Sequence, residues 1–184
     1  MAPHAIHGTV LDRAFSVIDS SHQSVTMKID LGERFGFAGS VQQTISINKD
    51  TIDFVLTLST DAERMPGQVG WHPWFARPCR IETDFAQMYV RDSDGIPSGE
   101  VVSPPAGPYD DCFTGARKSP RIIFDESITV QIDSDCSHWV VYDQPEHAIC
   151  VEPQSGPPDG FNLAPLVITR DKPLSRFMRF TVTK

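Results

Sequence analysis

The feature that most constrains the fold of this 184-residue sequence is a hydrophobic period of two residues. Apolar and polar residues alternate through the segments 25–31, 52–59, 128–133 and 178–183. Successive side chains of a β-strand point to opposite faces, so each segment predicts a strand with one buried face. No longer stretch has the 3.6-residue apolar spacing of an amphipathic helix. The sequence therefore predicts an all-β fold.

Shorter segments complete this prediction, and clusters of Pro, Gly, Asn and Asp separate them. Additional strands are expected at about 13–19, 40–48, 80–83, 86–91, 121–124, 138–142 and 147–152. Many short strands joined by such turns are typical of an antiparallel sandwich or barrel. No internal repeat or linker divides the chain, so we expect a single domain over residues 1–184.

Composition and charge narrow the class of partner. Hydrophobic residues make up 40% of the chain, which suffices for a packed core, and 24 acidic against 16 basic residues give a net charge of −8. This balance argues against nucleic acid and against an anionic membrane surface. No apolar run is long enough to span a bilayer, and the first residues lack a signal-peptide pattern. We therefore expect a cytoplasmic protein with a small, neutral or weakly charged ligand.

The four cysteines show no spacing that indicates a disulfide framework or a metal site. No two of them have C-x-x-C spacing, and a chain of this size does not depend on disulfides. No closely spaced pair of metal ligands is visible either. We expect reduced thiols and no metal site. The cysteines are Cys79, Cys112, Cys136 and Cys150.

Residues 70–75, Gly-Trp-His-Pro-Trp-Phe, form the first segment that could carry chemistry. Pro73 restricts the preceding residue to extended conformations, so the His72 ring is held in one direction beside two indoles. An imidazole among aromatic side chains has a poorly solvated charged form, which allows neighbours to tune its pKa near neutrality. The alternative is an aromatic corner of the core with a hydrogen-bonded histidine.

Residues 109–113, Tyr-Asp-Asp-Cys-Phe, form the second segment. On a strand, Asp110 and Asp111 would face opposite sides, so one carboxylate could enter a pocket. An aspartate there can accept hydrogen bonds from vicinal hydroxyls. The alternative is the common use of Asp in a turn or cap.

The third segment covers residues 149–162 and contains Glu152 at the end of an apolar run. We expect Pro153 to end the strand at this point. A carboxylate on a buried strand is costly unless it faces a polar cleft, so Glu152 should have a perturbed pKa and is a candidate general base. The alternative is an exposed glutamate on an edge strand.

These segments, in this order, resemble the aldose 1-epimerase (galactose mutarotase) family. Residues 70–75 are similar to its G-x-H-P-[YW]-F motif, and residues 109–113 to its L-D-x-C-F segment. Residues 150–153 followed by Phe161-Asn162 are similar to its E-P…F-N motif, and Ile6-His7-Gly8 to its H-G motif. The resemblance covers essentially the whole chain. It implies an antiparallel β-sandwich of the galactose-mutarotase type.

The resemblance also implies roles for individual residues. His72 corresponds to the catalytic acid and Glu152 to the catalytic base, while Asp110 and His7 would bind sugar hydroxyls. Trp74 would offer an aromatic face to the sugar ring. The implied reaction is the interconversion of the α and β anomers of a free aldohexose, with no metal or organic cofactor.

The sequence departs from the family pattern in two places. Asp111 stands where many members carry His. The H-G motif normally follows a series of strands that include a sugar-binding Arg, whereas here it lies at residues 7–8, so the chain is expected to lack the first strands. Two other functions stay open: a carbohydrate-binding protein without turnover, and a hexose-6-phosphate 1-epimerase in which Arg77 and Arg80 would meet the phosphate.

Overall fold

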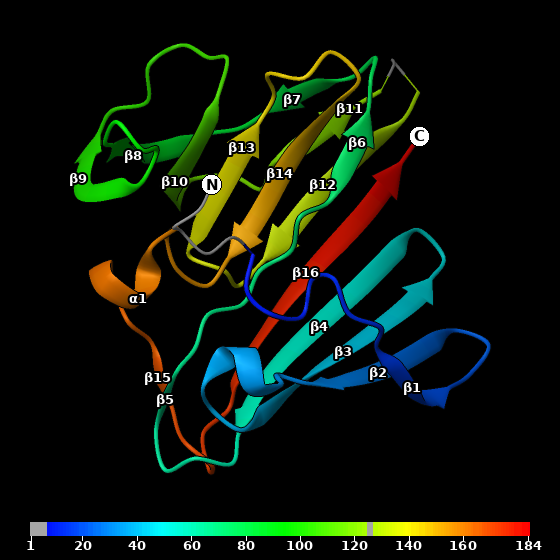
Figure 1. Cartoon of the computed structure of the whole chain (residues 1–184). Helices are drawn as coiled ribbons and strands as arrows, with labels where there is room; N and C mark the ends of the chain where they lie inside the picture. The colour runs from blue at the N-terminus through cyan, green and yellow to red at the C-terminus, as the bar shows by residue number, and fades with distance from the viewer. Residues whose placement is uncertain (1–6, 125–126) are drawn as a thin grey trace.

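The computed structural model describes residues 7–124 and 127–184. Its strands pair antiparallel in two large sheets and one small ribbon (Figure 1). The eight-stranded sheet has the order β1-β2-β3-β4-β16-β12-β11-β7, and the six-stranded sheet has the order β6-β14-β13-β10-β8-β9. β15 pairs with β5 in the ribbon. The prediction of an all-β antiparallel fold is confirmed.

The elements have the following bounds. The eight-stranded sheet consists of β1 (Ser16–Ser20), β2 (Ser24–Asp30), β3 (Gly39–Asn48), β4 (Thr51–Thr60), β16 (Leu174–Thr183), β12 (Thr129–Ser134), β11 (Arg121–Ile123) and β7 (Arg80–Glu82). The six-stranded sheet consists of β6 (Trp74–Ala76), β14 (Ala148–Gln154), β13 (His138–Tyr142), β10 (Asp110–Ala116), β8 (Phe85–Arg91) and β9 (Pro97–Val102). The remaining elements are β5 (Met65–Pro66), β15 (Val167–Ile168), the 3-10 helix η1 (Glu33–Phe35) and the helix α1 (Gly160–Leu163).

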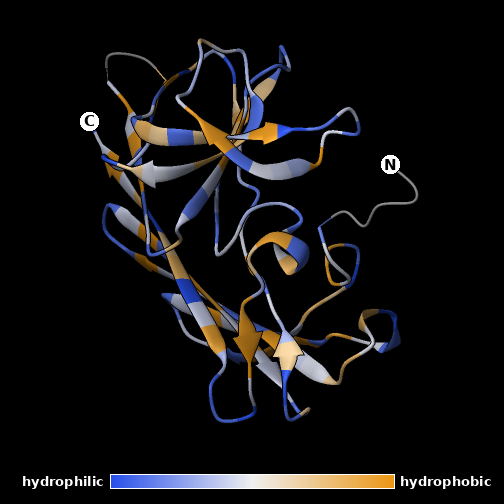
Figure 2. Ribbon diagram, turned by 90° about the vertical axis from the view of Figure 1, so that its left-hand side faces the viewer, coloured by the Kyte–Doolittle hydropathy of each residue, from blue (hydrophilic) through white to orange (hydrophobic). Residues whose placement is uncertain are grey.

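Two apolar clusters hold the sheets together. The first lies between the six-stranded sheet and the β16-β12-β11-β7 half of the eight-stranded sheet, and Phe113, Val151 and Ile132 belong to it. The second lies under the β5–β15 ribbon, against β2, β3 and β4, and includes Met65 and Leu58. Hydrophobic and hydrophilic residues alternate along the strands, as their orange and blue colours show (Figure 2). This alternation is what the two-residue period predicts.

The β1 end of the eight-stranded sheet is less well covered. β1 lies at the edge of this sheet, and all five of its residues are exposed. Val17 and Ile47 expose 61% and 54% of their surface. These apolar side chains contrast with the same sheet's β12, where Ile132 is fully buried.

Two expectations about strands need correction. β14 does not end at Pro153: it continues to Gln154, and Trp139 and His138 of β13 pair with Pro153 and Gln154. The Pro153 carbonyl also accepts a hydrogen bond from Trp71 N, which keeps the chain attached there. Five strands were not among those expected: β5, β6, β9, β10 and β15. β9 gave little signal because Pro and Gly are poor strand residues.

Candidate active site

A row of cross-strand partners on the six-stranded sheet brings the predicted segments together. Trp74 of β6 pairs with Cys150 of β14, Cys150 with Tyr142 of β13, and Tyr142 with Asp110 of β10. Partners in adjacent strands project from the same face of a sheet. Because the period is two, Glu152 shares this face with Cys150, whereas Ile149 and Val151 project into the core.

The segment before β6 holds His72 against this face. Gly70 forms an isolated bridge with Gln154, and a Cβ on Gly70 would lie 2.9 Å from Gln154 Cγ, so only glycine permits this approach. His72 then reaches two side chains of β14. Its Nε2 lies 3.2 Å from Glu152 Oε1, and its Nδ1 lies 3.3 Å from Cys150 Sγ. The imidazole is therefore held at both nitrogens.

Glu152 is a buried carboxyl group in the interior of the sheet. It is only 3% exposed, and β14 has neighbours on both sides, which excludes the exposed edge position. Burial raises its pKa to about 8; the Asp110 charge adds to this, while a hydrogen bond from Gln154 opposes it. The perturbed pKa expected from the sequence is confirmed.

The pKa of His72 moves in the opposite direction. Burial lowers it first, and the nearby His7 lowers it further, while the backbone carbonyl of His72 partly opposes both. A carboxyl group that holds its proton more tightly faces an imidazole that holds it less tightly. The pair is therefore suited to carry one proton between Nε2 and Oε1, and burial favours the neutral arrangement with the proton on Glu152.

Aromatic rings pack around His72. Trp74 stacks on it with centroids 5.4 Å apart and an interplanar angle of 16°. The same indole stacks on His147 at 5.9 Å and 12° and contacts Tyr142 edge-on at 5.9 Å. His7 contacts the His72 ring edge-on at 5.1 Å, from a left-handed backbone with φ 56°. The Trp74 ring expected to receive a sugar thus already stacks on two imidazoles, although 49% of its surface is exposed.

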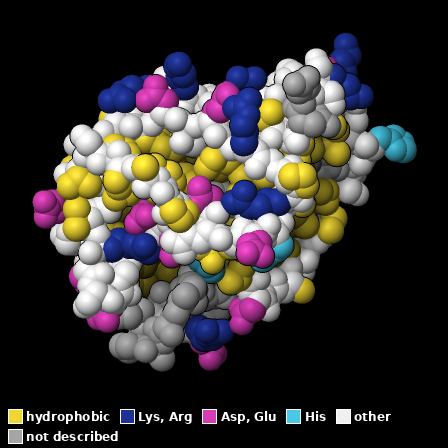
Figure 3. All heavy atoms as spheres, turned by 90° about the horizontal axis from the view of Figure 1, so that it is seen from above, with side chains coloured by type: hydrophobic (Ala, Val, Ile, Leu, Met, Phe, Trp, Pro, Cys, Tyr) yellow, Lys and Arg dark blue, Asp and Glu magenta, His cyan; other side chains and the backbone are white. Residues whose placement is uncertain are grey.

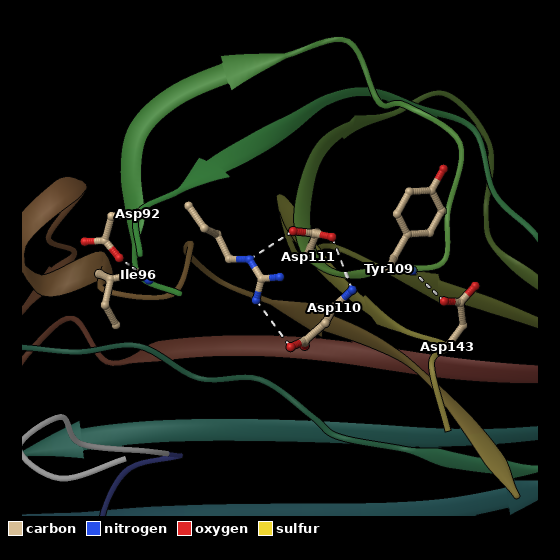
Figure 4. A network of polar contacts seen from close by, with 7 residues as sticks. Asp92, Ile96, Tyr109, Asp110, Asp111 and Asp143 are labelled. Carbon is tan, nitrogen blue, oxygen red and sulfur yellow. Dashed lines mark hydrogen bonds and ion pairs between the residues drawn. The ribbon is translucent and has the colours of Figure 1, made fainter. Parts of the chain in front are cut away.

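Asp110 and Asp111 are held by one guanidinium (Figure 4). Arg91 of β8 places Nη1 3.3 Å from Asp110 Oδ2 and Nε 3.0 Å from Asp111 Oδ1. The Asp110 amide also donates to Asp111 Oδ2 at 3.2 Å. The Asp110 side chain stays 47% exposed, so its carboxylate keeps room for a further donor. A hollow of about 500 Å³ opens beside Arg91 and Asp111.

Comparison with known proteins shows which family the chain belongs to. The family model for aldose 1-epimerase matches residues 2–169. The chain belongs to the aldose 1-epimerase family. No curated protein matches it.

Solved structures extend this family assignment to the fold. A galactose mutarotase-like protein from Clostridium acetobutylicum is 15% identical, with a TM-score of 0.82, over 97% of this chain and 69% of that one. A galactose mutarotase related enzyme from Lactobacillus acidophilus is 14% identical, with a TM-score of 0.74, over 94% and 72%. At such identities the likeness shows the shared mutarotase-like fold. This family member thus spans about 70% of the length of these chains.

One cluster in this family member has the composition of a metal site. Within residues 7–124 and 127–184, the ligand atoms of His72, Cys150 and Glu152 lie within 4.8 Å of one another. Two of these contacts are close: His72 Nδ1 hydrogen-bonds Cys150 Sγ at 3.3 Å, and His72 Nε2 lies 3.2 Å from Glu152 Oε1. All four cysteines are free thiols, as expected. No helix in the described part of the chain could cross a membrane.

The structure gathers His72, Glu152, Trp74, Asp110 and His7 around one face, and it adds residues that sequence reasoning missed. Cys150 could have been found, because it precedes Glu152 by two positions on a strand and must share its face. Arg91 gave no signal, since its role depends on the pairing of β8 with β10. A hollow of about 550 Å³ lies at the other end of β10, beside Thr114 and Ser137, and holds none of the predicted residues.

Proposed function

We propose that this protein is an aldose 1-epimerase that interconverts the α and β anomers of a free aldohexose such as glucose or galactose. The observation that carries the proposal is the 3.2 Å contact between His72 Nε2 and Glu152 Oε1 on the polar face of the six-stranded sheet. A hemiacetal bears its hydroxyl and its ring oxygen on the same carbon. Two neighbouring proton-transfer groups can therefore reach both oxygens at once.

The proposed reaction needs only these two groups. Proton transfer from Glu152 to His72 gives a carboxylate and an imidazolium without any net gain of protons. Glu152 takes the proton of the anomeric hydroxyl while His72 protonates the ring oxygen from Nε2, the bond from C1 to the ring oxygen breaks, and the aldehyde forms. Rotation about C1–C2 and closure on the other face return both protons. Each positioned acid or base contributes roughly 10²–10⁴-fold in rate.

The remaining residues would hold the sugar. Asp110 accepts hydrogen bonds from hydroxyl groups, with its carboxylate oriented by Arg91. His7 and Trp74 border the His72 ring and would contact the sugar from the side of the acid. Asp110 also adds negative charge near Glu152, which helps the carboxyl group to keep its proton until the sugar is bound.

The charge around the site favours a neutral sugar over a sugar phosphate. Arg91 is already shared by two carboxylates. Arg77 donates to the carbonyls of Asp143 and Pro145, and Arg80 pairs with Glu82. Basic and acidic side chains are interspersed on the face seen from above (Figure 3). A dianionic phosphate would thus lack an uncommitted cationic cluster among these groups.

Anomer-resolved proton NMR tests the proposal. The protein is added to pure α-glucose, α-galactose or α-glucose 6-phosphate, and the appearance of the β anomer is followed. We expect acceleration with the free sugars, lost in Glu152→Gln and retained in Glu82→Gln, a carboxamide control on β7. Sugar binding without acceleration would support the carbohydrate-binding alternative instead. Acceleration of glucose 6-phosphate alone would support the hexose-6-phosphate 1-epimerase.

A further inference from the structure

The thiol of Cys150 lies beside the two proton-transfer groups. Its residue is fully buried, and its Sγ is 3.3 Å from Nδ1 of His72, the ring nitrogen that does not face Glu152. The same Sγ lies within 4.8 Å of a carboxyl oxygen of Glu152, two residues further along the same face of β14, and the thiol lowers the pKa of that carboxyl group. Cys150 therefore lies next to both members of the pair. The proposed reaction uses only the contact between His72 Nε2 and Glu152 Oε1.

The number of hydrogens limits how the thiol can serve two partners. Burial raises the pKa of Cys150, and the nearby Glu152 carboxyl group raises it further, so sulfur keeps its hydrogen. A thiol has one hydrogen to donate and a weak acceptor on sulfur. If its S–H points to Glu152, then sulfur can only accept from His72, and the hydrogen of the imidazole must stand on Nδ1.

The contact at Nε2 of His72 also places the imidazole hydrogen on Nδ1. In the neutral pair, Glu152 holds the shared proton and His72 Nε2 accepts it, which leaves the imidazole hydrogen on Nδ1. In the ionised pair, both nitrogens carry hydrogen. Nδ1–H is thus present in both states, and only the proton between Nε2 and Oε1 moves.

We propose that Cys150 is a positioning residue: its sulfur accepts a hydrogen bond from Nδ1–H of His72 while its S–H donates to Glu152, which reserves Nε2 for proton exchange with substrate. The catalytic consequence rests on the proposed function, but the tautomer of His72 does not. The thiol gains and loses no proton and forms no bond during the reaction. Without it, His72 is free to adopt the other tautomer, in which Nε2 carries the hydrogen and cannot take the substrate proton back.

The tautomer can be read directly by ¹⁵N–¹H NMR of the imidazole rings, with His72 assigned by its absence in His72→Asn. In the wild-type protein we expect neutral His72 to carry its hydrogen on Nδ1. Cys150→Ala should shift it toward the Nε2–H tautomer, and Cys150→Ser should keep Nδ1–H, because a hydroxyl group also accepts and donates. Cys136→Ala is the matched control: it removes another buried thiol that has no contact with His72.

A neutral His72 with Nε2–H in the wild-type protein would overturn the inference without any variant, and so would an unchanged tautomer in folded Cys150→Ala. The kinetic readout is separate. Cys150→Ala should lower kcat by on the order of 10-fold or more with little change in KM, as for other groups that orient a histidine through its second nitrogen, and Cys150→Ser should recover most of it. A wild-type protein inactive on every aldose would reject the proposed function but leave the tautomer result intact.

Discussion

The two faces of β14 are equally buried and chemically opposite. Ile149 and Val151, at most 1% exposed, pack into the core between the sheets, whereas Cys150 and Glu152 face His72. On the core face burial stabilises the fold by removing hydrocarbon from water. On the other face burial penalises a charge and raises the pKa of Glu152 to about 8. The core face of this strand stabilises the fold, whereas its other face lowers stability but carries a titratable group.

The largest expected effect breaks the polar face alone. Glu152→Gln keeps shape and hydrogen bonding but cannot take a proton, so kcat should fall roughly 10²–10⁴-fold, as it should in His72→Asn. The circular dichroism spectrum should stay that of the wild type. Steady-state NMR kinetics on the better free sugar provide the measurement. Wild-type turnover in purified Glu152→Gln would remove Glu152 from the mechanism.

The matching change on the core face should lower stability and leave kcat unchanged. Ile149→Ala leaves a cavity in the cluster around Phe113 and should reduce the free energy of unfolding by about 2–5 kcal/mol. The folded fraction should keep its kcat, because the contacts of Glu152 are unchanged. Urea titration and NMR kinetics below the unfolding transition measure both quantities. A loss of kcat as large as that of Glu152→Gln would show that the two faces are not independent.

This contrast also marks what the sequence could and could not predict. The strict alternation in β4 and β12 predicted those strands, because period two has one structural meaning. In β14 every residue from Ala148 to Pro153 is buried, so burial alone does not reveal the polar face, and the motif around Glu152 had to point to it.

The remaining gaps have physical causes. The strand was expected to stop at Pro153, because a missing N–H usually ends a ladder, but its pairing with β13 continues through Pro153 to Gln154. The Arg91 clamp could not be expected, since it joins β8 to β10 across a pairing that sequence periodicity does not specify. The stack of His147 on Trp74 is likewise a product of the tertiary structure.

A smaller expected effect is the pH dependence of the free energy of unfolding that Glu152 causes. The pKa of Glu152 is near 8 in the folded protein and near the ordinary 4.5 when unfolded, so between these values the folded state binds the extra proton. Its contribution is fully present below about pH 4.5 and is lost as pH rises through about 8. Glu152→Gln has no such loss.

The stability of Glu152→Gln relative to wild type should therefore increase with pH over this window, by up to a few kcal/mol. Comparing the two proteins cancels the titration of the groups that lie away from Glu152. Urea unfolding at a series of pH values measures the difference. A difference that does not change between pH 5 and 8 would mean that Glu152 is ionised in the folded protein.

The smallest expected effect concerns the rim of the polar face, where Arg91 holds Asp110 and Asp111 (Figure 4). These groups are partly exposed, so the ion pairs are screened, and Arg91→Ala should change the free energy of unfolding by about 1 kcal/mol or less. Asp110 then loses its fixed orientation toward the sugar but keeps its charge. We expect KM to rise by a few-fold, on the order of one weakened hydrogen bond, with kcat nearly unchanged.

Arg117→Ala, which removes a comparable ion pair with Asp84, is the control and should leave KM unchanged. If Arg91→Ala instead lowered kcat as strongly as Glu152→Gln, the guanidinium would act on the reacting atoms, and Arg91 would belong to the catalytic centre.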